Sequence, residues 1–160
     1  MYICIYQKKC KMVKEKQILI PQENALDFML GGNALFTMAS SKTGNRFTYK
    51  ILKDVNKEDC LKVLWMNGKD NTMNYVQIAS IEKKNFMPVV NIKSIHYREN
   101  KAFLSFDFVF KKLVLMLPMP SLEIYHHGRC SRCGRILTVP DSIMNGIGPE
   151  CIFKQNAFEL

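Results

Sequence analysis

The chain has few of the residues that keep a polypeptide from folding, with only 8 Gly and 6 Pro among 160 residues. Disordered, collagen-like and low-complexity proteins are rich in such residues or poor in apolar ones, whereas 48% of this chain is hydrophobic. No apolar run reaches the length of about 18 residues that a membrane-spanning helix needs. The composition therefore indicates a soluble globular protein.

The N-terminal residues lack the pattern of a secretory signal. Residues 1–6 are too few for its apolar segment, and the lysines follow them instead of preceding them. We therefore expect an intracellular protein. In a reducing compartment, the 6 cysteines of this chain favour metal binding over disulfide formation.

Common catalytic motifs are also missing from the sequence. It contains no phosphate-binding GxxxxGK[ST] loop, no GxSxG nucleophile turn and no paired His/Glu metal motif. Gly31-Gly32 fits a helix cap better than a ligand-binding loop, and His96 fits a surface or packed residue better than a general base. We expect no catalytic residues and no enzymatic activity.

Acidic residues are scarce relative to basic ones, since 14 Asp+Glu face 23 Lys+Arg and leave a formal net charge of +9. This balance favours acidic partners such as nucleic acid or an anionic protein surface. The excess is +4 in residues 1–17, +4 in residues 18–125 and +1 in residues 126–160. No segment is a dedicated basic stripe, so the charge does not by itself require nucleic acid.

Local patterns predict a mixed α and β protein. Gly31-Gly32 would end a short first helix. Gly44 lies among the five residues between two β-rich runs, which is typical of a hairpin. We expect helices at 22–30 and 101–117 and strands at 34–40, 46–52, 61–66, 74–81 and 86–92.

Two periods compete between residues 101 and 117. Phe106, Phe108 and Phe110 alternate as in a strand. A longer series steps by three and four, as in a helix, and consists of Phe103, Phe106, Phe110, Leu113 and Leu117. We expect a helix, ended by Pro118 and Pro120.

Three cysteines near the C-terminus have the spacing of a metal site. Cys130 and Cys133 form a CxxC pair followed by Gly134, which is typical of a zinc knuckle. Cys151 follows Pro149, a residue favoured in the first turn of a helix, so we expect its thiolate at a helix N-terminus. The other cysteines, Cys4, Cys10 and Cys60, are scattered and are expected to be free thiols.

Zinc needs a fourth ligand, and His126 and His127 immediately precede the CxxC pair. Spacing does not separate the two histidines. A histidine ligand would close the site, so we expect one structural Zn²⁺ that supplies much of the local folding energy. Arg129, Arg132 and Arg135 would compensate the negative thiolates, and Thr138 would cap a short helix that Gly146 ends.

These elements predict an α+β fold: an antiparallel β meander with flanking helices and a C-terminal, treble-clef-like zinc module whose last helix starts near Pro149. The expected organisation is a basic arm at residues 1–17, an α+β domain at 18–120 and a zinc-binding module at 121–160 packed on it.

The metal-site sequence resembles a known family. Residues 128–135 read Gly-Arg-Cys-Ser-Arg-Cys-Gly-Arg, and residues 146–151 read Gly-Ile-Gly-Pro-Glu-Cys. This is similar to the zinc-binding domain of unknown function found in many phage and mobile-element proteins. The similarity is close over residues 126–151 and extends loosely to the hairpin sequence at 36–49. It implies His126 as the fourth ligand beside Cys130, Cys133 and Cys151.

The resemblance also implies a function. Proteins similar to this one include small inhibitors of bacterial defence, among them zinc-containing anti-CRISPR proteins that act on the type II effector nuclease. The expectation is therefore a phage-encoded, non-enzymatic binding protein in the cytoplasm of the bacterial host, with a host protein as partner. The alternative is a phage accessory nucleic-acid-binding zinc protein, favoured by the net charge and by the mixed basic and aromatic sequence Arg46-Phe-Thr-Tyr-Lys50.

Overall fold

A computed structural model describes residues 17–69 and 73–154. Within these ranges the chain forms a seven-stranded antiparallel sheet with the strand order β1-β7-β2-β3-β4-β5-β6. The strands are β1 (Ile18–Leu19), β2 (Asn33–Ser40), β3 (Arg46–Lys53), β4 (Cys60–Met66), β5 (Tyr75–Lys84), β6 (Met87–Ile92) and β7 (Leu122–His126). The predicted α+β class is confirmed. The predicted arm, apart from Gln17, lies outside the described residues, as do Cys4 and Cys10.

The meander from β2 to β6 follows the local sequence signals. β2 pairs with β3 as an antiparallel hairpin in which Thr37 faces Thr48. Gly44 lies in the connecting turn with a φ of +72°, a conformation that glycine adopts without steric cost. β4, β5 and β6 then pair in chain order, as predicted.

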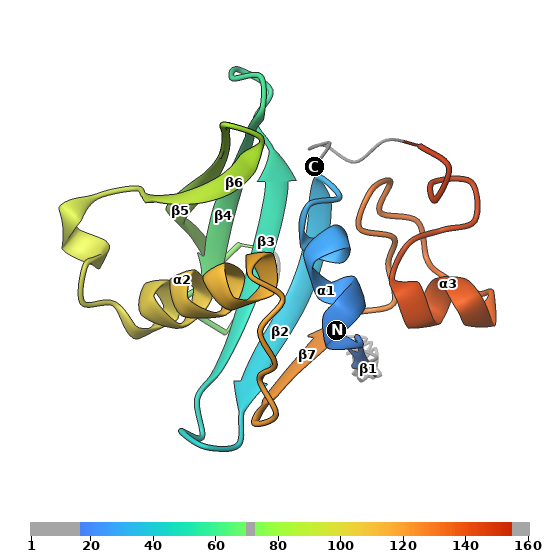
Figure 1. The fold of residues 1–160 in the computed structure, drawn as a ribbon, viewed down its shortest axis with the longest axis horizontal. Coiled ribbons are helices and arrows are strands. Elements are labelled where there is room, and N and C mark those ends of the chain that lie inside the picture. The colour runs from blue at the N-terminus through green and yellow to red at the C-terminus, as the bar shows by residue number, and fades with distance from the viewer. Residues whose placement is uncertain (1–16, 70–72, 155–160) are drawn as a thin grey trace, which may run out of the picture.

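The helices α1 (Gln22–Met29) and α2 (Lys101–Val114) lie against the same face of the sheet (Figure 1). The Asn100 side chain caps α2 by accepting the Phe103 N–H at 2.9 Å. The helix ends at Val114, earlier than predicted. Met116, at a φ of +53°, takes the chain out of the helix before the prolines. A 3-10 turn, η1 (Ile95–Tyr97), precedes α2.

The main core lies between this face of the sheet and the two helices. It contains a run of aromatic rings, in which Tyr49 is 5.6 Å from Phe36 and 5.4 Å from Phe106 between centroids. The buried Tyr49 hydroxyl donates to the Ala102 carbonyl at 2.8 Å, which joins β3 to α2. Burial raises the pKa of Tyr49 well above its usual value, so this hydroxyl stays protonated.

Strands β1 and β7 were not predicted. β7 lies between β1 and β2, with Met38 facing Ile124 on one side and Leu19 facing Tyr125 on the other. The segment after the predicted boundary at residue 120 thus contributes an interior strand to the sheet. We use "C-terminal module" below for residues 127–154, which follow β7.

The C-terminal module contains one short helix, α3 (Pro140–Asn145), which ends at Gly146 in the left-handed conformation as predicted. Val139 occupies its N-cap without a side-chain hydrogen bond, so the predicted cap by Thr138 is wrong. Residues 149–153 form turns, so the predicted helix near Pro149 is wrong as well. The treble-clef arrangement stays a prediction. Among the described helices, none is both long and apolar enough to span a membrane.

Candidate metal centre

The CxxC segment forms a tight turn that carries the first two cysteines. The Cys130 N–H donates to the Arg135 carbonyl at 2.9 Å, and the Gly134 N–H donates back to the Cys130 carbonyl at 2.9 Å. Gly134 has a φ of +77°, which lets the chain reverse directly after Cys133. The knuckle predicted from the spacing therefore has a backbone basis.

Among the described residues, Cys130, Cys133 and Cys151 lie close enough to hold a metal ion, with their sulfur atoms within 4.8 Å of one another. A turn at the Gly148 carbonyl brings Cys151 to the knuckle, because this carbonyl accepts the N–H groups of Cys151 and Ile152 at 3.0 Å each. Cys130 and Cys151 are buried, whereas Cys133 is exposed. The structure thus brings together three of the four predicted ligands.

Backbone N–H groups surround the Cys130 sulfur. Gly148 donates to it at 3.3 Å and Arg132 at 3.4 Å. Burial alone would raise the pKa of Cys130, but these donors and the Cys133 N–H outweigh it and lower the pKa to about 7. A substantial fraction of this thiol is therefore ionised near neutral pH.

Cys151 behaves in the opposite way. Its burial and its closeness to Cys133 and Cys130 raise the pKa of its thiol to about 11. Three sulfurs this close repel one another when they are ionised, and a bound cation removes that penalty. The donor set of three cysteines therefore fits a soft, thiolate-binding metal ion.

The structure does not bring His126 to the cysteines. It is the last residue of β7, and its ring is fully buried on the core side, 5.7 Å from the Phe28 ring. Its Nδ1 accepts the Gly128 N–H at 3.0 Å, and its Nε2 lies 2.6 Å from the Ile143 carbonyl. Both ring nitrogens are thus engaged. The hydrogen bonds make His126 a structural link between β7 and the C-terminal module.

His127, the other candidate, also lies away from the cysteines. Its Nε2 is 3.2 Å from the Thr37 hydroxyl, on the face of the sheet that α1 and α2 leave open. Consecutive residues at the end of a strand point to opposite faces, which separates the two histidines. In the part of the chain that the structure describes, no histidine joins the three sulfurs.

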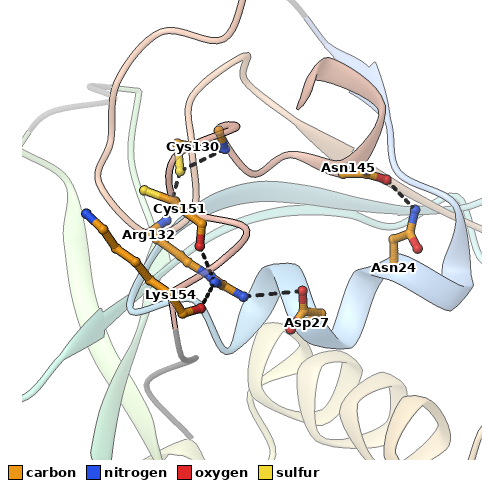
Figure 2. Close-up of polar contacts among 8 residues, drawn as sticks. Asn24, Asp27, Cys130, Arg132, Asn145, Cys151 and Lys154 are labelled. Atoms are coloured by element: carbon orange, nitrogen blue, oxygen red, sulfur yellow. Dashed lines mark hydrogen bonds and ion pairs between the residues drawn. The ribbon is translucent and has the colours of Figure 1, made fainter. Parts of the chain in front are cut away.

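The arginines of the knuckle donate to backbone carbonyls and pair with carboxylates. The Arg132 guanidinium donates to the Cys151 and Lys154 carbonyls and lies 3.6 Å from the Asp27 carboxylate (Figure 2). Arg135 pairs with Glu150 at 3.4 Å in an exposed position. Arg132 thus ties the Cys151 turn to α1, and the expected compensation of thiolate charge by the arginines stays a prediction.

Two further contacts hold the C-terminal module on the sheet. The Asn33 N–H donates to the Ser131 carbonyl at 2.7 Å, directly after Gly31 and Gly32. A Cβ atom on Gly31 would lie 2.4 Å from the Ser131 hydroxyl, so only glycine allows this approach. Asn24 of α1 donates to Asn145 of α3 at 3.1 Å (Figure 2). The Gly31-Gly32 pair was the sequence signal for this docking site, although it predicts only a helix cap.

A cavity of about 190 Å³ opens beside the cysteines. Its walls include Thr138, Ser142 and Glu150 together with the three cysteines. Glu150 is the one carboxylate among the lining residues, and its side chain is 77% exposed and pairs with Arg135. A positioned general base of the kind that hydrolytic zinc sites use is therefore absent from these walls.

The comparisons with known proteins concern this same part of the chain. No curated protein and no solved structure matches the chain. One family model matches residues 121–153, from just before β7 to just after Cys151, and its description is "Family of unknown function (DUF6011)". The matched segment contains the whole candidate metal centre and the strand that joins it to the sheet.

Proposed function

We propose that this protein is a non-enzymatic binding protein whose C-terminal module is held by one structural zinc ion. The observation that carries the proposal is the set of three sulfurs within 4.8 Å of one another, two of them buried. Thiolates select zinc among the abundant divalent ions, and the site would take a further ligand to complete a tetrahedron. Zinc supplies no redox chemistry here, and its role is to fix the positions of the knuckle and the Cys151 turn.

Metal analysis of the purified protein tests the metal. We expect about one zinc per chain. Cys130→Ser and Cys151→Ser should abolish it, because each removes a buried thiolate. Cys60→Ser is the matched control, since Cys60 is buried but lies outside the cluster. Unchanged zinc in Cys130→Ser, or none in the wild type purified with zinc supplied, would contradict the proposal.

The binding role extends to a partner through the resemblance to phage proteins. We propose that the partner belongs to the host defence machinery and that a type II CRISPR effector nuclease is the first candidate. A cleavage assay with the purified nuclease, guide and target DNA tests this proposal. Wild-type protein should block cleavage in proportion to its concentration, and Cys60→Ser should act as the wild type. Full cleavage at a large excess of protein would remove this partner.

A further inference from the structure

The face of the sheet opposite α1 and α2 carries a groove that the metal centre does not explain. Among the described residues no helix covers this face (Figure 1). The groove has a volume of about 790 Å³ and crosses strands β2 to β5. Thr37 and Thr48 form part of its floor, with their hydroxyl oxygens 2.8 Å apart.

The charge of the groove is of one sign. Arg46, Lys50 and Arg129 line it, and no carboxylate is among its lining residues. Arg46 and Arg129 are exposed, and Lys50 is half-buried. Arg129 comes from the C-terminal module, where it also donates to the Gly134 carbonyl at 3.2 Å. The sheet and the module thus contribute cations to one surface, which fits an anionic ligand.

The strand that carries these cations has two different faces. Arg46, Thr48 and Lys50 alternate along β3 with Phe47 and Tyr49. Tyr49 is buried in the core, so the basic side chains point to the open face. The mixed basic and aromatic sequence therefore divides by face, and the aromatic residues of the open surface come from other strands.

Two tyrosines provide them. Tyr75 lines the groove, whereas Tyr125 is not among the lining residues and donates its hydroxyl to the Glu123 carboxylate. The Lys50 Nζ lies 4.1 Å from the centre of the Tyr75 ring on β5. The Arg46 guanidinium lies 5.6 Å from the Tyr125 ring on β7. In each pair the cation lies over one face of the ring, so a base stacks on that face once the cation has moved from the ring to a phosphate. A nucleotide needs these two features together, one for the phosphate and one for the base.

We propose that this open face binds single-stranded nucleic acid. Arg46, Lys50 and Arg129 contact phosphates, and the rings of Tyr75 and Tyr125 stack on bases. The inference shares with the proposed function only the premise that the chain is a binding protein. It requires neither the zinc ion nor the defence nuclease.

The dimensions of the face fit a single strand better than a duplex. The two tyrosines lie on β7 and β5, four strand spacings apart, which is about 19 Å at about 4.8 Å per spacing. Flat sheet surfaces of this kind bind several unstacked nucleotides. Paired bases in a duplex do not expose their faces to a tyrosine ring. An acidic peptide would use the cations but would leave the ring surfaces unused.

Fluorescence anisotropy with a labelled oligonucleotide of about 20 nucleotides tests the proposal. The wild-type protein should bind single-stranded DNA or RNA more tightly than the matching duplex, and its affinity should fall as salt rises from about 50 mM to about 200 mM. Arg46→Gln with Lys50→Gln should weaken binding about tenfold at low salt. The slope of log affinity against log salt should become shallower by about 1.4, since each phosphate contact to a single strand contributes about 0.7.

Two charge-matched controls locate the site. Lys42→Gln with Lys112→Gln removes two charges at the β2–β3 turn and on α2, away from the open face, and should bind as the wild type. Lys8→Gln with Lys9→Gln removes two charges from the basic N-terminal residues and should likewise bind as the wild type. Tyr75→Leu keeps an apolar side chain but removes the ring, and should weaken binding about tenfold without changing the salt slope.

Several results would overturn the proposal. They are tighter binding of the duplex, equal losses in all three charge variants, or loss confined to Lys8→Gln with Lys9→Gln. No binding by wild-type protein that carries its full metal content would also overturn it, and would leave the zinc proposal standing. Conversely, wild-type protein that holds no zinc after purification with zinc supplied, but still binds single strands, would reject the zinc proposal alone.

Discussion

The sheet with its two helices and the C-terminal module are stabilised in different ways. The sheet buries a continuous apolar cluster that includes Phe28, Phe36, Tyr49, Phe106 and Phe110. The cluster of the C-terminal module has only four buried members, namely Cys130, Leu137, Ile147 and Cys151. Two of these four are proposed metal ligands. Apolar burial thus dominates in the first region, whereas the second has little of it and would depend on the proposed zinc ion and on hydrogen bonds to the first.

The largest effect of a single substitution is expected in the sheet region. Phe106 is fully buried, and its ring lies 5.4 Å from Tyr49 and 5.6 Å from Phe110. Phe106→Ala should lower the free energy of unfolding by about 3–5 kcal/mol in urea denaturation, because it removes a large apolar side chain and leaves a cavity. Phe108→Ala, on the same helix but 58% exposed, should change it by about 0.5 kcal/mol or less. Equal losses in the two variants would contradict the position of the core.

A smaller effect is expected at the junction of the two regions. The Arg132 side chain is 10% exposed and donates to the Cys151 and Lys154 carbonyls. Arg132→Ala leaves these acceptors without that donor and should cost about 2 kcal/mol. Hydrogen exchange of the Arg132→Ala protein should show faster opening of the backbone around residues 148–154 than of the sheet. Arg135→Ala removes only an exposed pair and should cost less than about 1 kcal/mol. A larger loss there would show that the comparison of the two arginines is wrong.

A further effect, at most as large as that of Arg132→Ala, concerns pH. Burial lowers the pKa of His126, and the Gly128 N–H donated to its Nδ1 requires the neutral ring. Below about pH 6.5 the unfolded chain binds a proton that the folded chain excludes, so stability falls as pH falls, by at most about 1.4 kcal/mol per pH unit.

Urea unfolding of the zinc-loaded protein from about pH 7.5 to about pH 5 measures this dependence. Metal release is common to the wild type and the variants below, so the difference between their profiles isolates His126. His126→Gln keeps a donor for the Ile143 carbonyl and should flatten the profile over this range. His96→Gln changes an exposed residue and should leave the profile as in the wild type. An unchanged profile in His126→Gln would mean that other groups cause the acid sensitivity.

Local signals predicted the elements whose pairing is local. The hairpin of β2 and β3, with its glycine turn, and the two helices depend on residues close in sequence. β1 has two residues and β7 has five, and both are strands because distant residues pair with them, such as Ile124 with Met38. A single sequence carries no signal for such pairing.

The candidate metal centre was predictable only as far as it depends on residues close in sequence. The CxxC turn and the glycines around Cys151 are local features, and they bring three sulfurs together. The expected histidine ligand could not be predicted in this way, because closeness in sequence does not decide to which face of the sheet a strand residue points. His126 faces the core and His127 faces the open surface, so neither ring lies beside the cysteine sulfurs. The side of the sheet on which Arg46 and Lys50 lie likewise required the position of α2 to be known.

The place of β7 has a consequence for cutting the chain at the start of this C-terminal segment. A segment that starts at residue 121 takes with it an interior strand, and its removal would expose the backbone hydrogen-bonding groups of β2 and leave β1 without its partner. A fusion or truncation designed at that boundary would yield an aggregating remnant instead of two independent pieces. A protein to which this segment is grafted by design must therefore offer β7 an unpaired strand like β2.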